Sequence, residues 1–263
     1  MLTKSTTTIM AKKIKKVKPG HIRVTPFDNR YMSSAPYVND LTNLPEWFRR
    51  IPKGKGSVRA CVGITDFLGT GFTIPAWTNF SFKPRTDMNE WEMRADNMNP
   101  GIDYPMLGLF GYEQTGECPM TRQRELEKMP YPKLITPWRI QTAPGWSCLI
   151  LPVLYDQPSE YTILPAIVHT DFYQIMNVVI NPLTGSDFSI KYGTPLVHVI
   201  PFKRDSDITK IDFEDESFFK YASSNMYLTG GIGPASGTGA AYRRAVRIVD
   251  SFIAQSKNRF WHR

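Results

Sequence analysis

A chain of 263 residues that is 41% hydrophobic and 13% aromatic can bury a proper core, so disorder of the whole chain is excluded. Its 21 prolines and 18 glycines indicate many turns. The net charge of +8 is gathered at one end, because residues 1–20 contain six lysines and no acid, which leaves +2 for the other 243 residues. A strongly basic body is therefore excluded, and a basic N-terminal arm is predicted.

The arm over residues 1–20 is expected to attract an anionic partner, either phosphate, anionic lipid or an acidic protein surface. Its candidate binding residues are Lys12, Lys13, Lys15, Lys16 and Lys18. The alternative is a solvated tail without a specific ligand. No apolar run approaches about 18 residues, so no membrane span is expected. Three widely spaced cysteines and no secretory signal favour synthesis in a reducing cytosol.

The first elements along the chain are a strand and two helices. Residues 21–27 alternate polar and apolar side chains and predict an edge strand, limited by Pro26. A short helix is predicted from Asn43 to Arg50, because Asn followed by Pro and Glu is a favoured helix start. A second short helix is predicted over 58–68, ending at Gly69.

A hairpin is predicted next. Residues 72–83 read as one strand with aromatic side chains at the alternating positions Phe80 and Phe82. Residues 90–95 can pair with it across a turn near Thr86 and Asp87, which would bury both phenylalanines. Residues 96–136 show weak periodicity and are interpreted as loops around one short element.

Residues 142–204 form the most informative segment, because β-branched and aromatic runs alternate there with Pro, Gly, Asn and Asp. A turn at residues 142–146 precedes the first run. The predicted strands of this antiparallel unit are residues 147–155, 163–171, 174–180 and 189–202.

The order of these pieces resembles the barrel of the dUTPase and dCTP-deaminase family. The matching residues are Pro144-Gly145, then Ala166-Ile167-Val168-His169-Thr170-Asp171-Phe172, then the segment from Phe188 to Val199. The resemblance implies a trimer-forming β-barrel. In the family an Asp that activates the attacking water stands where this chain has His169, and the strand from Ser147 to Leu151 lacks the family's phosphate-contacting Arg-Ser motif. The resemblance thus implies an inherited scaffold with lost nucleotide chemistry.

A second resemblance concerns residues 193–204, Gly-Thr-Pro-Leu-Val-His-Val-Ile-Pro-Phe-Lys-Arg. This sequence is similar to segments of uncharacterised proteins of tailed phages, especially marine ones. It implies a viral origin, with synthesis in the host cytoplasm and a possible place in the virion. Beyond Arg204 we expect a strand over 208–213, a short helix over 214–221, a Gly-rich loop over 230–239 and an amphipathic helix over 240–257.

Several candidate sites compete with structural interpretations. His169, Asp171 and His198, with Arg204 for an oxo-acid, match the residue types of a non-haem iron site. Only 26 residues separate Asp171 from His198, which is short for that fold, so a turn Asp and two hydrogen-bonded strand histidines are favoured. Cys148 is expected to be a buried small hydrophobe. The Gly-rich loop is interpreted as a linker rather than a phosphate site.

Aromatic residues among the strands could, with Lys and Arg, form a stacking surface for single strands. Core packing is the commoner role of such residues. The small charge of the body gives no support for a large nucleic-acid footprint, so the arm is the expected contact for nucleic acid.

Together these observations predict a mainly β fold, a dUTPase-like β-barrel or sandwich with an N-terminal extension and a C-terminal helix. The expected domains are the arm (1–20), a β-rich globular domain (21–213, with its barrel-like unit at 133–204) and a linker with a terminal helix (214–263). The preferred function is a non-catalytic phage protein that acts as a homo-oligomer through assembly or binding, without a cofactor. The alternatives are a divergent nucleotide pyrophosphatase and an Fe(II)/2-oxoglutarate oxygenase.

Overall fold

A computed structural model describes residues 16–42, 44–52, 54, 57–96, 107–110, 126 and 128–205. The chain divides into two compact units, unit 1 with residues 1–36 and 73–205 and unit 2 with residues 37–72 and 206–263. The expected elements between 208 and 257 lie outside the described residues, as do Lys12, Lys13 and Lys15 of the arm. No helix in the described part of the chain has the length and apolar character that crossing a membrane requires.

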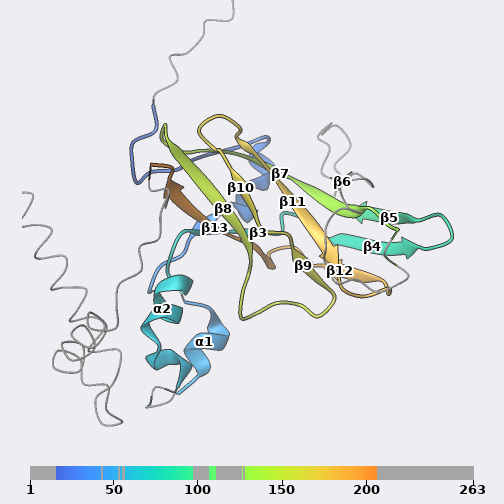
Figure 1. Ribbon diagram of the computed structural model, residues 1–263, viewed down its shortest axis with the longest axis horizontal. Helices are drawn as coiled ribbons and strands as arrows, with labels where there is room; N and C mark the ends of the chain where they lie inside the picture. Colours follow the sequence, from blue (N-terminus) through green and yellow to red (C-terminus); the bar gives the residue numbers. More distant parts are fainter. Residues whose placement is uncertain are drawn as a thin grey trace, which may run out of the picture. The chain divides into compact units, whose positions relative to one another are not determined.

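Two antiparallel sheets make up most of the described part of unit 1 (Figure 1). In the first sheet the strand order is β1-β7-β11-β9, with β6 also paired to β7. In the second the order is β10-β8-β13-β3. The bounds of the first set are β1 Arg23–Pro26, β6 Leu107–Phe110, β7 Tyr131–Gln141, β9 Tyr161–Ile163 and β11 Ile175–Pro182. Those of the second are β3 Phe72–Pro75, β8 Trp146–Pro152, β10 Ala166–Val168 and β13 Pro195–Lys203.

A third, three-stranded sheet has the order β12-β4-β5, with β4 Phe80–Arg85, β5 Glu90–Ala95 and β12 Phe188–Ile190. The β4–β5 hairpin has the expected turn, and Phe80 and Phe82 are each 1% exposed. Phe82 stacks on Phe188 of β12 at 4.7 Å between ring centroids. The prediction of this hairpin and of its buried face is confirmed.

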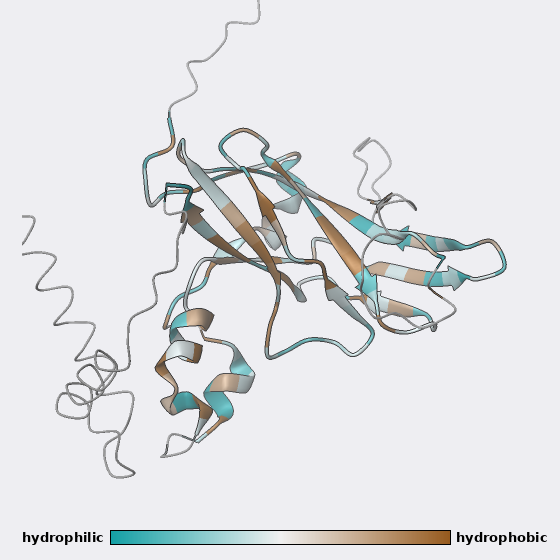
Figure 2. Cartoon of the chain, in the orientation of Figure 1, coloured by the Kyte–Doolittle hydropathy of each residue, from teal (hydrophilic) through white to brown (hydrophobic). Residues whose placement is uncertain are grey.

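Alternation of side chains builds the core of unit 1. On β7 the even-numbered Leu134, Trp138 and Ile140 are buried, and on β11 the buried residues begin with Met176 and Val178. Hydrophobic and hydrophilic residues accordingly alternate in colour along the strands (Figure 2). This period of two leaves one face of β1, β7 and β11 outside the core. The prediction of a mainly β fold is confirmed, and in the described residues the sheets are open layers, as in a sandwich.

The described part of unit 2 contains β2 Tyr37–Val38, α1 Glu46–Arg50, a 3-10 turn at Val58–Ala60 and α2 Val62–Leu68. The guanidinium of Arg59 donates to the carbonyls of Arg49 (2.9 Å) and Ile51 (3.0 Å). It also lies 5.8 Å from the ring centroid of the buried Phe48. These contacts satisfy carbonyls at the end of α1, which a helix of five residues leaves unpaired.

Two helix boundaries differ from the predictions. The prediction of an Asn43 start is wrong, because α1 begins at Glu46 with Pro45 as its N-cap, and Asn43 itself lies outside the described residues. The residue before a proline is biased away from the helical conformation, which delays the start. The predicted helix over 58–68 is interrupted at Cys61, whose ψ of 106° is extended, although it ends at Gly69 as expected.

Three predicted strands prove to be two strands each. The run 72–83 breaks after Pro75, the run 163–171 breaks at Leu164 and Pro165, and the run 189–202 breaks at Tyr192 and Gly193. In each case the two halves belong to different sheets. Proline lacks a donor for the ladder and glycine permits the left-handed conformation, so these residues mark the places where the chain crosses between sheets.

Two predictions about strand ends are confirmed. β1 is an edge strand that ends at Pro26, and the turn at Pro144 and Gly145 precedes β8. Gly145 has φ +80°, a conformation that side-chain-bearing residues adopt at a cost. A Cβ at Gly145 would meet nothing within 4 Å, so the constraint there is the backbone conformation and not space.

We therefore predict that Gly145→Ala lowers the free energy of unfolding by about 1 kcal/mol or more. Gly145→Asn should cost less, because Asn tolerates the left-handed region better. Gly63→Ala is the control, since Gly63 in α2 has an ordinary φ and equally open surroundings. Denaturant unfolding of the full chain measures all three. Equal stability of the Ala and Asn variants at position 145 would contradict the proposed cause.

Candidate functional site: an ion pair beside an aromatic groove

Asp171 and Arg204 form the central ion pair of unit 1. Arg204 Nη1 and Nη2 donate to Asp171 Oδ1 (2.9 Å) and Oδ2 (2.6 Å), a bidentate pairing of guanidinium and carboxylate. The side chain of Asp171 is 4% exposed and that of Arg204 is 27% exposed. Asp171 follows β10 and Arg204 follows β13, so the pair joins two chain segments 33 residues apart.

The backbone of the Gly145 turn completes this pair. Its N–H donates to Asp171 Oδ2 (2.9 Å), and its carbonyl accepts from the backbone N–H of Arg204 (2.9 Å). Arg204 Nη1 also donates to the carbonyl of Trp146 (3.0 Å). The Arg204 guanidinium, followed by the Gly145 amide, holds the pKa of the Asp171 carboxyl below its ordinary value, against the effect of burial. Asp171 is therefore a structural carboxylate that stays ionised.

Ser147 and His169 lie beside the ion pair. Ser147 Oγ accepts from Arg204 Nη1 (2.9 Å) and lies 2.8 Å from Nδ1 of His169, to which its hydroxyl can donate. Ser147 has no exposed surface, whereas His169 is exposed. A Ser-His pair suggests a nucleophile and its base, but the buried hydroxyl cannot reach a substrate. We call Gly145, Ser147, His169, Asp171 and Arg204 the Asp171 cluster.

A second layer of buried polar groups lies next to this cluster. Thr142 Oγ1 and Thr170 Oγ1 are 2.8 Å apart, and Cys148 Sγ lies 3.4 Å from Thr170 Oγ1. Cys148 has no exposed surface, and burial raises the pKa of its thiol to about 11. The prediction that Cys148 is a buried hydrophobe is confirmed. These hydrogen bonds fix the segment that leads into the β10–β11 turn.

The β10–β11 turn presents two aromatic side chains. Phe172 is 80% exposed and Tyr173 is 54% exposed, and both backbone N–H groups donate to the carbonyl of His169 (2.9 and 2.8 Å). The Arg204 guanidinium lies 5.5 Å from the Phe172 ring centroid, a cation–π contact. The turn is thus held by the Asp171 cluster while its two side chains remain accessible.

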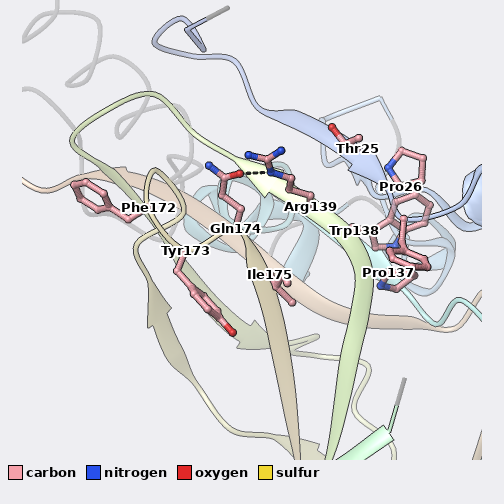
Figure 3. A pocket seen from close by; sticks show the side chains of 10 residues that line it. Thr25, Pro26, Pro137, Trp138, Arg139, Phe172, Tyr173, Gln174 and Ile175 are labelled. Atoms are coloured by element: carbon pink, nitrogen blue, oxygen red, sulfur yellow. Dashed lines mark hydrogen bonds between the residues drawn. The ribbon is translucent and has the colours of Figure 1, made fainter. Parts of the chain in front are cut away.

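Beside the turn lies an open groove of about 520 Å³ on the outward side of β1, β7 and β11. Figure 3 shows Arg139 and Gln174 between the aromatic turn and Thr25 and Pro26, with the hydrogen bond from Arg139 Nε to Gln174 Oε1 drawn. We call this the aromatic groove; its main residues are Phe27, Pro137, Arg139, Phe172, Tyr173 and Ile175.

The residues of the iron interpretation are not gathered into one site. Asp171 is bound to Arg204, His169 is bound to Ser147, and the buried His198 lies opposite Leu151 in the β8–β13 ladder. Among the described residues no group of three or more His, Cys, Asp or Glu side chains is placed to hold a metal ion. Of the arm, Lys16 and Lys18 are described, and both are exposed on either side of the buried Val17.

Sequence reasoning singled out Asp171, His169 and Arg204 but missed how they combine, and it missed the aromatic groove. The signal that could have revealed the groove is the pair Phe172-Tyr173 directly after Asp171. Aromatic residues are usually found in strand cores, so two of them after an Asp that is expected in a turn indicate an exposed position.

Comparisons with known proteins are sparse. No protein-family profile matches this chain, and no curated protein matches it. Among solved structures, the native EIAV dUTPase is similar over 32% of this chain and 70% of its own, with 14% sequence identity and a TM-score of 0.26.

We predict that Asp171→Asn lowers the free energy of unfolding by about 2 kcal/mol at pH 7, because Arg204 loses its charged partner. Since the folded pKa of Asp171 lies below the unfolded value of about 3.9, its contribution is present above that pH and is lost as pH falls through the folded pKa. The gap between wild type and variant should therefore close in acid.

Denaturant unfolding between pH 7 and pH 2 tests this prediction. Asp28→Asn is the matched control, because Asp28 pairs with Arg30 at the surface and its pKa is lowered to about 2, chiefly by the Arg30 hydrogen bond. Salt should screen the exposed Asp28 pair more than the Asp171 pair. A pH-independent gap for Asp171→Asn would contradict the assignment.

Proposed function

We propose that this chain acts by binding and assembly and not by catalysis. The observation that carries the proposal is the exposure of Phe172 and Tyr173 on a turn that a part-buried ion pair holds in place. When a partner covers large aromatic side chains that are exposed to water, the free energy of the system falls, which favours binding. Holding them in one arrangement lowers the entropy that binding would otherwise cost.

The Asp171 cluster supports the non-catalytic part of the proposal. A general base needs a lone pair directed at its substrate, whereas both Asp171 oxygens accept hydrogen bonds from Arg204 and one also from Gly145. His169 occupies the position at which the dUTPase family, which this chain resembles in part, has its water-activating Asp. We infer that the residue at this position, His169, does not activate water and instead helps to hold the turn.

We further propose that the chain is a phage protein, made in the host cytoplasm and incorporated into the virion as a homo-oligomer. The resemblance of residues 193–204 to tailed-phage proteins supports the phage origin, and the trimeric barrels of the dUTPase family support a trimer. The lysines of the N-terminal arm add a contact for an anionic partner, and Lys16 and Lys18 are exposed as such a contact requires.

The first test is nucleotide turnover by the full chain. With Mg²⁺ and either dUTP or dCTP we expect no release of pyrophosphate and no rise in melting temperature, since no nucleotide is expected to bind the native state selectively. The same is expected with Fe²⁺ and 2-oxoglutarate. Pyrophosphate release that Asp171→Asn abolishes would overturn the proposal in favour of a nucleotide pyrophosphatase.

The second test concerns assembly. Sedimentation velocity over a range of protein concentrations should show a closed oligomer, and mass spectrometry of purified phage particles should detect the chain. A monomer at every concentration would remove the oligomer from the proposal, and absence from the particles would remove the virion role.

A further inference from the structure

We infer that the aromatic groove binds single-stranded nucleic acid, with bases stacked on Phe172 and Tyr173 and phosphates contacted by cations of the adjoining sheet face. This inference rests on the proposed binding function and names the class of partner. It is carried by two independent properties of the outward face of β1, β7 and β11: its charge and its exposed aromatic side chains.

The strands of this face carry cations and no carboxylate. Residues 21–36 and 73–205 together contain 13 Lys and Arg against 15 Asp and Glu, so unit 1 without its arm is slightly acidic. Among the described strands Asp and Glu occur only in β5, and β1, β7 and β11 together carry Arg23, Lys133 and Arg139. The net charge of the whole body does not reveal these cations, because acidic residues elsewhere in the body cancel them. A surface that excludes carboxylates and keeps cations is complementary to phosphate.

The cations lie on the outward side of the sheet. Arg139 stands opposite Thr25 of β1 and Ile175 of β11, within the groove. Its Nε donates to Gln174, and its terminal nitrogens have no partner among the described residues, so they remain available as donors. Within that part of the chain, no ion pair involves Lys133 or Arg139 either.

The two cations of β7 are spaced to contact one extended anion. Lys133 and Arg139 lie opposite Val179 and Ile175, which are four residues apart on β11, or about 13 Å at ~3.3 Å per strand residue. The Lys133 stem passes over β6 at Gly108, where a Cβ would stand 3.2 Å from Lys133 Cε. An extended anion can contact both cations at once.

The aromatic side chains specify a single strand. In a duplex the faces of the bases are already stacked on one another, so they are closed to protein side chains. Unpaired bases offer their faces, and each base stacked on an aromatic side chain contributes measurably to affinity without a sequence requirement. Phe27, at 56% exposure, offers a third aromatic side chain on the opposite side of the groove from the turn.

The basic arm is continuous with the groove. The exposed Lys16 and Lys18 precede β1 by only a few residues, and Thr25, Pro26 and Phe27 at the end of β1 line the groove. A strand lying in the groove can therefore be met by the arm from its own chain. The arm supplies salt-sensitive attraction, and the groove supplies the preference for unpaired bases.

The experiment measures fluorescence anisotropy of a labelled 20-nucleotide oligothymidine with the full chain, against a duplex of the same length. We expect the single strand to bind more tightly than the duplex. Phe172→Ala, Tyr173→Ala and Arg139→Gln should each weaken single-strand binding by about tenfold while the proteins stay folded by circular dichroism. Replacing Lys12, Lys13, Lys15, Lys16 and Lys18 with Gln should reduce the salt dependence but keep the sensitivity to Tyr173→Ala.

Matched controls lie elsewhere on unit 1. Tyr192→Ala removes a tyrosine that is 47% exposed in the turn before β13, and Lys83→Gln removes an exposed strand cation on β4. Both should bind within about twofold of wild type, because neither residue belongs to the groove. Equal loss with these controls would show that only overall charge or stability matters and would overturn the inference.

Other outcomes separate this inference from the proposed function. If the groove variants bind oligothymidine as wild type does, or if the duplex binds as tightly as the single strand, the groove is not the nucleic-acid site. If no oligonucleotide binds and Tyr173→Ala instead dissociates the oligomer in sedimentation, the groove is an interface between copies of the chain. The binding function would then stand while the inference fails.

Discussion

The pairing of Asp171 with Arg204 is the interaction on which the candidate site depends. It brings together the turn before β8, the segment after β10 and the end of β13, and the Gly145 backbone serves both partners. A carboxylate with 4% exposure is stable there because a bidentate guanidinium and an amide replace the water it has lost. The pairing of β8 with β10 and β13 also joins these segments, and the ion pair fixes them at the ends of those strands.

The cluster uses groups that catalysis would otherwise need. Hydrolytic sites use residues of the types of Ser147, His169 and Asp171. In this chain each of the three is hydrogen-bonded to a neighbour, and Ser147 has no exposed surface. Hydrogen-bond capacity that is spent on holding a turn is not available to a substrate. The same hydrogen bonds fix the turn that presents Phe172 and Tyr173: both backbone amides are bound, the Phe172 ring contacts Arg204, and both side chains remain exposed. Rigid polar groups beneath accessible aromatic rings support the proposed binding role.

The predictions from sequence succeeded where the signal was local. Alternation located β1 and the hairpin of Phe80 and Phe82, and glycine marked the turn at Gly145. They failed where two strands follow each other without a polar loop, as at Leu164 and Pro165. A continuous apolar run looks the same in the sequence whether it stays in one sheet or crosses to the next. Here β9 is mostly buried, whereas Ala166 and Ile167 of β10 are exposed. Asp171 and Arg204 were noticed as residues, but a pairing across 33 positions leaves no periodic trace.

The amino-acid sequence by itself determined the mainly β character, the positions of the main turns and the separation of a basic arm from a nearly neutral body. These follow from neighbours along the chain, since side-chain alternation and the conformations of Gly and Pro are local properties. The tertiary structure decided which strands share a sheet, that Asp171 meets Arg204 and not a metal ligand set, and that cations without carboxylates face one side of β1, β7 and β11. Those are relations between residues distant in sequence, which exist only once packing has brought the strands together.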